Sequence, residues 1–233
     1  MKAKQNKAQH HNRLTRSESS FHRDHKPQPS VNARLPSGGW CALTLCQKMK
    51  PQKTAFLDKF NPKRTLDKAL TSGITASVQH NSLYRESLQP KIKEAVKCEW
   101  RDFLQGLVNR YATQQSEAAY ERDIEALKDL MNSRFPHAFR DDRHPKFGTD
   151  PGFRISHAQK SISVFLKHLW CMGQVATPPQ CPVDRVILTK ACAKDPRWGR
   201  VNTIKEHRDR IIILKAARPN QSEPLAEWEL RTF

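Results

Sequence analysis

From residue 54 onward, hydrophobic residues recur at steps of three and four, the spacing of an amphipathic helix. The segment 90–111 carries the pattern at Ile92, Val96, Trp100, Phe103, Leu104, Leu107 and Val108. Pro90 suits the first turn of such a helix. The segment 116–135 repeats the pattern, with Ser116 as its cap and Pro136 as its stop. Each segment therefore predicts one helix.

Helical signals continue on both sides of these segments. Residues 54–88 predict short helices that are interrupted at Asn61-Pro62 and at Ser72-Gly73. Near the C-terminus, Thr203 and Glu206 have the spacing of a capping box, which predicts a helix start. The chain shows neither strand-type alternation of useful length nor an internal repeat. We therefore expect a mainly α fold, with a single helical domain over residues 54–233.

Residues 1–53 differ in character from the rest of the chain. They mix Lys, Arg, His, Ser, Gln and Pro without apolar periodicity, which predicts a disordered arm. Residues 1–50 contain ten Lys or Arg residues against two acids, Glu18 and Asp24, so the arm is strongly basic. Either the arm lies along phosphates, or it is an expendable leader.

The formal net charge of +18 is the strongest global signal. A field of this sign attracts polyanions, and nucleic acid is the commonest of them. We therefore expect DNA as the partner, with RNA as the alternative. No apolar run reaches the roughly 18 residues that span a bilayer, and no signal-peptide pattern is present. We expect no membrane partner and a cytoplasmic location, associated with the nucleoid if the protein binds DNA.

The stretch "ISHAQKSISVFLKHLWCMGQVATPPQCPVDRVIL", residues 155–188, is the most informative part of the chain. Its first part predicts a helix that ends at Gly173, with a buried stripe at Ala158, Ile162, Phe165, Leu166, Leu169 and Met172. Lys160, Ser163 and Lys167 fall on the other, polar side. After a proline-rich loop, a second helix is expected from Pro182-Val183. If the two helices pack together, Lys160 and Asp184 can form a reactive pair. The alternatives are a solvated lysine and an aspartate that caps its helix.

The order of these features, with a turn, a lysine, an apolar helix, a loop, Pro-Val-Asp and a second apolar helix, resembles the helix-hairpin-helix DNA glycosylase/AP lyase superfamily. The resemblance covers roughly residues 140–217. The segment "RISHAQK" contains no glycine, which departs from the family's glycine-rich hairpin. The resemblance implies an all-α fold that flips a damaged base into a pocket between two helical lobes. It implies that Lys160 attacks the deoxyribose C1′ and that Asp184 stabilises the developing positive charge.

Basic residues gather around this stretch. Arg154, His157, Lys167 and Arg185 are the candidate nucleic-acid contacts. Trp170 and Trp228 either stack on a base or pack in the core. The six cysteines form no C-x-x-C pair, and we expect no metal and no cofactor. The oligomeric state is not indicated.

Three functions are therefore open. The first is a DNA-binding glycosylase/AP lyase with a Schiff-base lysine. The second is a non-catalytic helical protein that binds nucleic acid through the same basic face. The third is a structural or host-interaction protein whose charge is incidental.

Overall fold

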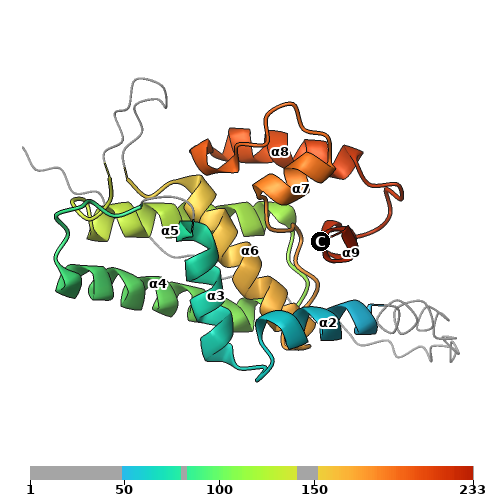
Figure 1. The fold of residues 1–233 in the computed structure, drawn as a ribbon, viewed down its shortest axis with the longest axis horizontal. Coiled ribbons are helices and arrows are strands. Elements are labelled where there is room, and N and C mark those ends of the chain that lie inside the picture. The colour runs from blue at the N-terminus through green and yellow to red at the C-terminus, as the bar shows by residue number, and fades with distance from the viewer. Residues whose placement is uncertain (1–48, 80–82, 141–151, 233) are drawn as a thin grey trace, which may run out of the picture. The chain divides into compact units, whose positions relative to one another are not determined.

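The computed structural model describes residues 49–79, 83–140 and 152–232 (Figure 1). Of the predicted disordered arm, residues 1–53, the segment 1–48 lies outside the described residues. The described part contains eight α-helices, one 3-10 helix and no strand. This confirms the prediction of a mainly α fold. All described residues belong to one compact unit, residues 39–233.

The first four described helices are α2 (Lys50–Phe60), α3 (Leu66–Val78), α4 (Pro90–Tyr111) and α5 (Glu117–Arg134). Within the described residues the first helix begins at Lys50, so residues 50–53 of the predicted arm belong to α2. Helix α4 starts at Pro90, and the Ser116 hydroxyl caps α5 by accepting from the Ala119 amide at 3.2 Å. Both starts agree with the sequence patterns that predicted them.

The second half contains α6 (Ile155–Cys171), α7 (Arg185–Lys190), the 3-10 helix η1 (Trp198–Arg200), α8 (Ile204–Ala216) and α9 (Leu225–Thr232). The capping box before α8 is present, because Thr203 accepts from the Glu206 amide and Glu206 accepts from the Thr203 amide. Helix α7 begins later than expected. Its N-cap is Asp184, so Pro182 and Val183 precede the helix.

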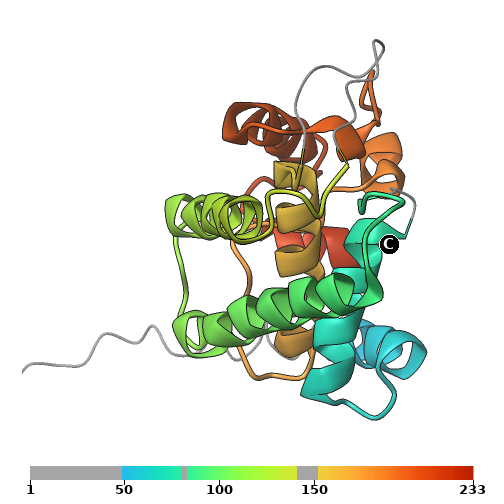
Figure 2. The same ribbon diagram turned by 90° about the vertical axis from the view of Figure 1, so that its left-hand side faces the viewer.

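Helix α6 lies in the middle of the other helices in both views (Figures 1 and 2). Every residue of α6 except Val164 is buried. The expectation of one polar side with Lys160, Ser163 and Lys167 is therefore wrong, because α6 is covered all round.

Burial of so many polar residues on α6 is possible because other elements supply their partners. Ser161 accepts from the Trp100 indole at 3.0 Å. Ser163 shares a hydrogen bond with the Tyr120 hydroxyl. Together these contacts attach α6 to α4 and α5.

Helix α3 runs without interruption through Gly73, so the predicted break at Ser72-Gly73 is wrong. The reason is a close approach between two helices. A Cβ atom at Gly73 would lie 2.7 Å from the backbone oxygen of Ser161 and 3.1 Å from Cβ of Phe165. Glycine at this position lets α3 lie directly against α6.

The hydrophobic interior has two parts. The larger cluster surrounds α6 and includes residues of α2, α3, α4 and α5. The smaller cluster joins α7, α8 and α9 around Ile187, Leu188, Leu214 and Trp228. The candidate site lies where α6 meets α7 and α9.

Candidate functional site

A pocket of about 400 Å³ is lined by residues of α2, α3, α6, α9, η1 and the start of α7. This volume is within the roughly 300–1,000 Å³ of small-molecule sites. Three aromatic side chains line it, Phe56 and Phe60 of α2 and the partly buried Trp198 of η1. The α6 side is polar, with Lys160, Lys167 and His168. The pocket therefore offers both stacking surfaces and charged groups.

Lys160 and Asp184 meet in the lining of this pocket. The Lys160 Nζ atom lies 2.6 Å from Asp184 Oδ2. Both side chains are largely buried, with exposed fractions of 10% and 15%. The Lys160 ammonium also lies 6.0 Å from the centre of the Trp198 ring, within the range of a cation–π contact. The sequence predicted that these two residues can pair, and the structure brings them together.

Local contacts fix the position of Asp184. Its Oδ1 atom accepts from the Ile187 amide at 2.9 Å and so caps α7. The preceding residue, Val183, is held through both its backbone groups by the Gln159 side chain of α6, at 2.8 and 3.2 Å. Gln159 and Lys160, two consecutive residues of α6, thereby hold Val183 and Asp184, the two residues that directly precede α7. Asp184 therefore has two partners: the Ile187 amide, through which it caps α7, and the Lys160 ammonium.

A second ion pair lines the same pocket. The Lys167 Nζ atom lies 2.9 and 2.7 Å from the two carboxylate oxygens of Glu229 in α9. The side chains are 6% and 2% exposed. Burial raises the pKa of Glu229, and the charge of Lys167 opposes that rise. This ion pair joins α9 to α6. Removal of either partner would leave the other charge buried and unpaired, which is strongly destabilising.

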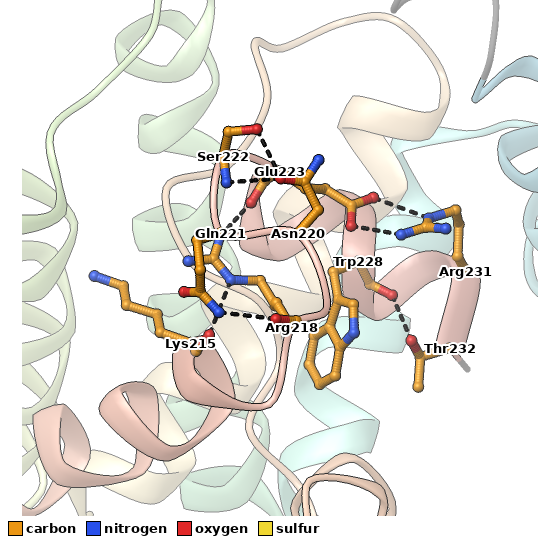
Figure 3. A network of polar contacts seen from close by, with 9 residues as sticks. All are labelled: Lys215, Arg218, Asn220, Gln221, Ser222, Glu223, Trp228, Arg231 and Thr232. Atoms are coloured by element: carbon orange, nitrogen blue, oxygen red, sulfur yellow. Dashed lines mark hydrogen bonds and ion pairs between the residues drawn. The ribbon is translucent and has the colours of Figure 1, made fainter.

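The loop that leads into α9 is held by a polar network (Figure 3). Glu223 receives two hydrogen bonds from the Arg231 guanidinium, at 2.9 and 2.5 Å. The backbone oxygen of Glu223 accepts from Arg218, and the Thr232 hydroxyl donates to the Trp228 backbone oxygen. These contacts anchor both ends of α9, which carries Glu229.

His168 is the remaining ionisable residue that α6 contributes to the pocket. Burial and the neighbouring charges of Lys167 and Lys68 lower the pKa of His168 to about 4. Its ring packs against Phe56 with centroids 4.8 Å apart. Its Nδ1 atom is buried and has no hydrogen-bond partner among the described residues. His168 is therefore a neutral side chain near neutral pH.

The structure separates the predicted site residues into two groups. Lys160, Asp184, Lys167 and Arg185 all line the pocket. Arg154 and His157, at the start of α6, are not among its lining residues.

The prediction that His157 contacts nucleic acid is wrong, because this side chain is fully buried. Its Nδ1 atom accepts from the Arg154 amide at 3.2 Å, so it helps to cap α6. Burial and the nearby charge of Arg154 lower the pKa of His157 to about 3, which keeps the ring neutral. Lys167 is also buried, so it faces the pocket rather than bulk solvent.

Sequence reasoning missed several residues of the pocket. Phe56 and Phe60 look like ordinary core positions of a helix, and Glu229 lies 62 residues from its partner Lys167. Trp198 follows a short, irregular stretch without a helical pattern. Its position in "DPRWGR", an exposed basic turn, is the only sequence signal for it. By contrast, Trp170 and Trp228 are 3% and 5% exposed, which agrees with core packing.

The turn that the resemblance implied before Lys160 falls in the connection between α5 and α6. Helix α5 ends at Arg134 and α6 begins at Ile155, so residues 135–154 join them. Residues 141–151 of this connection lie outside the described part of the chain. The implied hairpin therefore stays a prediction.

Within the described ranges, no group of three or more His, Cys, Asp or Glu residues is arranged to hold a metal ion. Among the same residues, no helix is both long enough and apolar enough to cross a membrane. The chain matches no protein-family model, no curated protein and no solved structure.

Proposed function

We propose that this protein binds DNA and acts as a base-excision glycosylase/AP lyase, with Lys160 as the Schiff-base nucleophile. The observation that carries the proposal is the 2.6 Å contact between Lys160 and Asp184 in the lining of a pocket of nucleotide-compatible size. Amine and carboxylate are the two groups that this reaction needs. The same proposal places the protein in the cytoplasm, at the nucleoid.

The chemistry follows from this geometry. Lys160 must lose a proton before it attacks, and Asp184 Oδ2 is positioned to accept it. On an abasic site, the amine then adds to the C1′ aldehyde and water leaves, which gives an iminium ion. On a damaged nucleotide, the C1′–Nζ bond forms as the C1′–N bond to the base breaks, and the base leaves with the proton that Asp184 holds. The C1′–O4′ bond of the sugar then breaks, O4′ takes a proton from Nζ, and the same iminium ion forms. The Asp184 carboxylate stabilises the positive charge of the iminium.

Strand cleavage and release complete the cycle. Loss of a C2′ proton from the iminium breaks the C3′–O bond, and the 3′ phosphate leaves with the electron pair. Water then hydrolyses the Schiff base and returns Lys160 as an amine. The aromatic side chains that line the pocket, Phe56, Phe60 and Trp198, provide surfaces on which a flipped base can stack.

A second candidate is a non-catalytic helical protein that binds nucleic acid. The observation that favours it is the double use of Asp184, which caps α7 through Oδ1 and pairs with Lys160 through Oδ2. In this alternative the ion pair only joins α6 to α7. The exposed Arg185 would then contact phosphates without any reaction.

Borohydride reduction decides between the two functions, because it traps a Schiff base as a stable amine. We expect a covalent adduct with abasic-site DNA in the native chain and no adduct in Lys160→Gln. Tryptic mapping should locate the adduct on Lys160 rather than on another amine. Asp184→Asn keeps an oxygen for the α7 cap but loses the charge, so its trapping rate should fall about 100-fold or more.

The control is Lys205→Gln, which removes an exposed lysine of α8 and should leave trapping unchanged. Circular dichroism checks that each variant is folded. The lyase proposal fails if the native chain gives no adduct, or if Lys160→Gln gives the same yield. Salt-sensitive DNA or RNA binding without trapping would then identify the non-catalytic alternative.

A further inference from the structure

One face of α3 borders the pocket with polar side chains. Lys68, Thr71, Ser72, Thr75 and Gln79 all line the pocket. Their spacing of three and four residues places them on a single helical face.

This polar face lies opposite the side of α3 that packs in the core. The buried residues of α3, including Ala69, Leu70, Gly73 and Ile74, form its inner face. The residues of the polar face are exposed or partly exposed. The Thr71 hydroxyl accepts from Arg101 at 3.2 Å. For the other four side chains, the described residues provide no hydrogen-bond or ion-pair partner.

The charges around the pocket are unevenly matched. The two acids that line it, Asp184 and Glu229, are each neutralised by a lysine of α6. Two further basic side chains line the pocket, Lys68 of α3 and Arg185 of α7. Both are exposed, and neither pairs with a carboxylate in the described part of the chain. The pocket therefore has a net positive lining with two available cations.

We propose that this polar face of α3 binds the sugar–phosphate backbone of the strand whose nucleotide enters the pocket. The inference rests on the proposed function, because it takes that nucleotide to be part of DNA. Lysine ammonium, Ser and Thr hydroxyl and Gln amide groups are common donors to phosphate oxygens. From Lys68 to Gln79 the face extends roughly 16 Å at about 1.5 Å per residue, enough for a few nucleotides.

Lys68 is the positively charged residue of this face and lies at its N-terminal end. It lies on the part of α3 near His168, whose pKa its charge helps to lower. It is therefore close to the C-terminal half of α6, about two helical turns from Lys160. We assign to Lys68 a phosphate that flanks the extruded nucleotide, with Ser72 and Thr75 on the adjoining backbone.

The test is equilibrium binding of an oligonucleotide that contains a tetrahydrofuran abasic analogue, which cannot form a Schiff base. Affinity is measured from low to moderate salt for the native chain, Lys68→Gln and the matched control Lys205→Gln. Both variants remove one positive charge, so they change the long-range field equally. Loss of one phosphate contact should reduce the slope of log affinity against log salt by about 0.9 in Lys68→Gln. The slope should not change in Lys205→Gln.

A second variant tests the hydroxyl groups without a change of charge. Thr75→Val keeps the shape of the side chain and removes its donor, and we expect about tenfold weaker binding. The inference is overturned if Lys68→Gln and Lys205→Gln have the same salt slope. It is also overturned if a free nucleoside monophosphate competes equally well with the oligonucleotide in the native chain and in Lys68→Gln, because the site would then hold a small ligand.

Failure of the inference is distinguishable from failure of the proposed function. Borohydride trapping at saturating abasic DNA depends on Lys160, whereas the salt slope depends on the phosphate contacts. Trapping together with an unchanged salt slope in Lys68→Gln would contradict the phosphate contact of α3 and support the lyase proposal. A reduced salt slope in Lys68→Gln without any trapping would support the phosphate contact of α3 and contradict the lyase proposal.

Discussion

His157, His168 and His207 are buried histidines whose pKa values lie well below that of the free side chain. Burial is the largest cause for each, and it lowers the pKa to about 3 for His157 and about 4 for the other two. An unfolded chain binds protons on histidine below pH about 6.5, which the folded protein cannot do. Stability contributed by these residues is therefore full above that pH and is lost as the pH falls toward 4.

Replacing His157 by Asn should make the free energy of unfolding less dependent on pH. A single buried histidine contributes a slope of up to about 1.4 kcal/mol per pH unit below its unfolded pKa. Asn retains an acceptor for the Arg154 amide, which His157 now caps. Urea unfolding between pH 7.5 and 4.5 measures the slope. His137→Asn is the control because His137 is exposed, and an equal slope in His157→Asn and the native chain would contradict the expectation.

At the scale of single residues, sequence reasoning succeeded where the partners lie in one motif. Lys160 and Asp184 were matched because one helix and one loop connect them. Lys167 was not matched with Glu229, since nothing in the local sequence points to a partner 62 residues away. His157 was misassigned for a related reason, because helical periodicity assumes one exposed face and α6 has none.

At the scale of elements, the helix starts were predictable because their signals are local. Pro90, Ser116 and the pair Thr203 and Glu206 act through the backbone of their own turn. Gly73 misled because glycine has two uses in a helix. It weakens the helix locally, but it also permits close packing, and only the position of α6 shows which use applies.

The packing of α3 on α6 predicts opposite effects for two helical glycines. Gly73→Ala should destabilise the protein by about 1–3 kcal/mol, because the new Cβ would lie 2.7 Å from the Ser161 backbone oxygen. Gly106→Ala in α4 should stabilise it by about 0.5–1 kcal/mol, since nothing lies within 4 Å of the new atom.

Chemical denaturation of both variants measures the difference. Because the substitution is the same, helix propensity alone would make both variants more stable. A stabilising Gly73→Ala would therefore show that α3 and α6 are not in close contact. A salt-slope change in Gly73→Ala would in addition report a shift of the polar face of α3.

At the scale of the whole molecule, charge is distributed between two parts of the chain. Residues 1–48 carry nine Lys or Arg residues and two acids, within a total formal charge of +18. The pocket adds the exposed Lys68 and Arg185. Electrostatic attraction to DNA is long-ranged and independent of sequence, whereas the reaction needs the local contacts of Lys160. The two contributions are therefore separable.

A chain that starts at Met49 tests this separation. The deletion ends just before α2, the first described helix, and it keeps Met49, which is 5% exposed and packs in the core. We expect weaker DNA binding and a smaller salt slope, because the removed segment carries a net +7 of the total charge. At saturating DNA, borohydride trapping should match that of the full chain. Unchanged affinity at low salt would mean that DNA is attracted only by the helical domain. Lost trapping at saturation would mean that residues 1–48 contribute to the reaction itself.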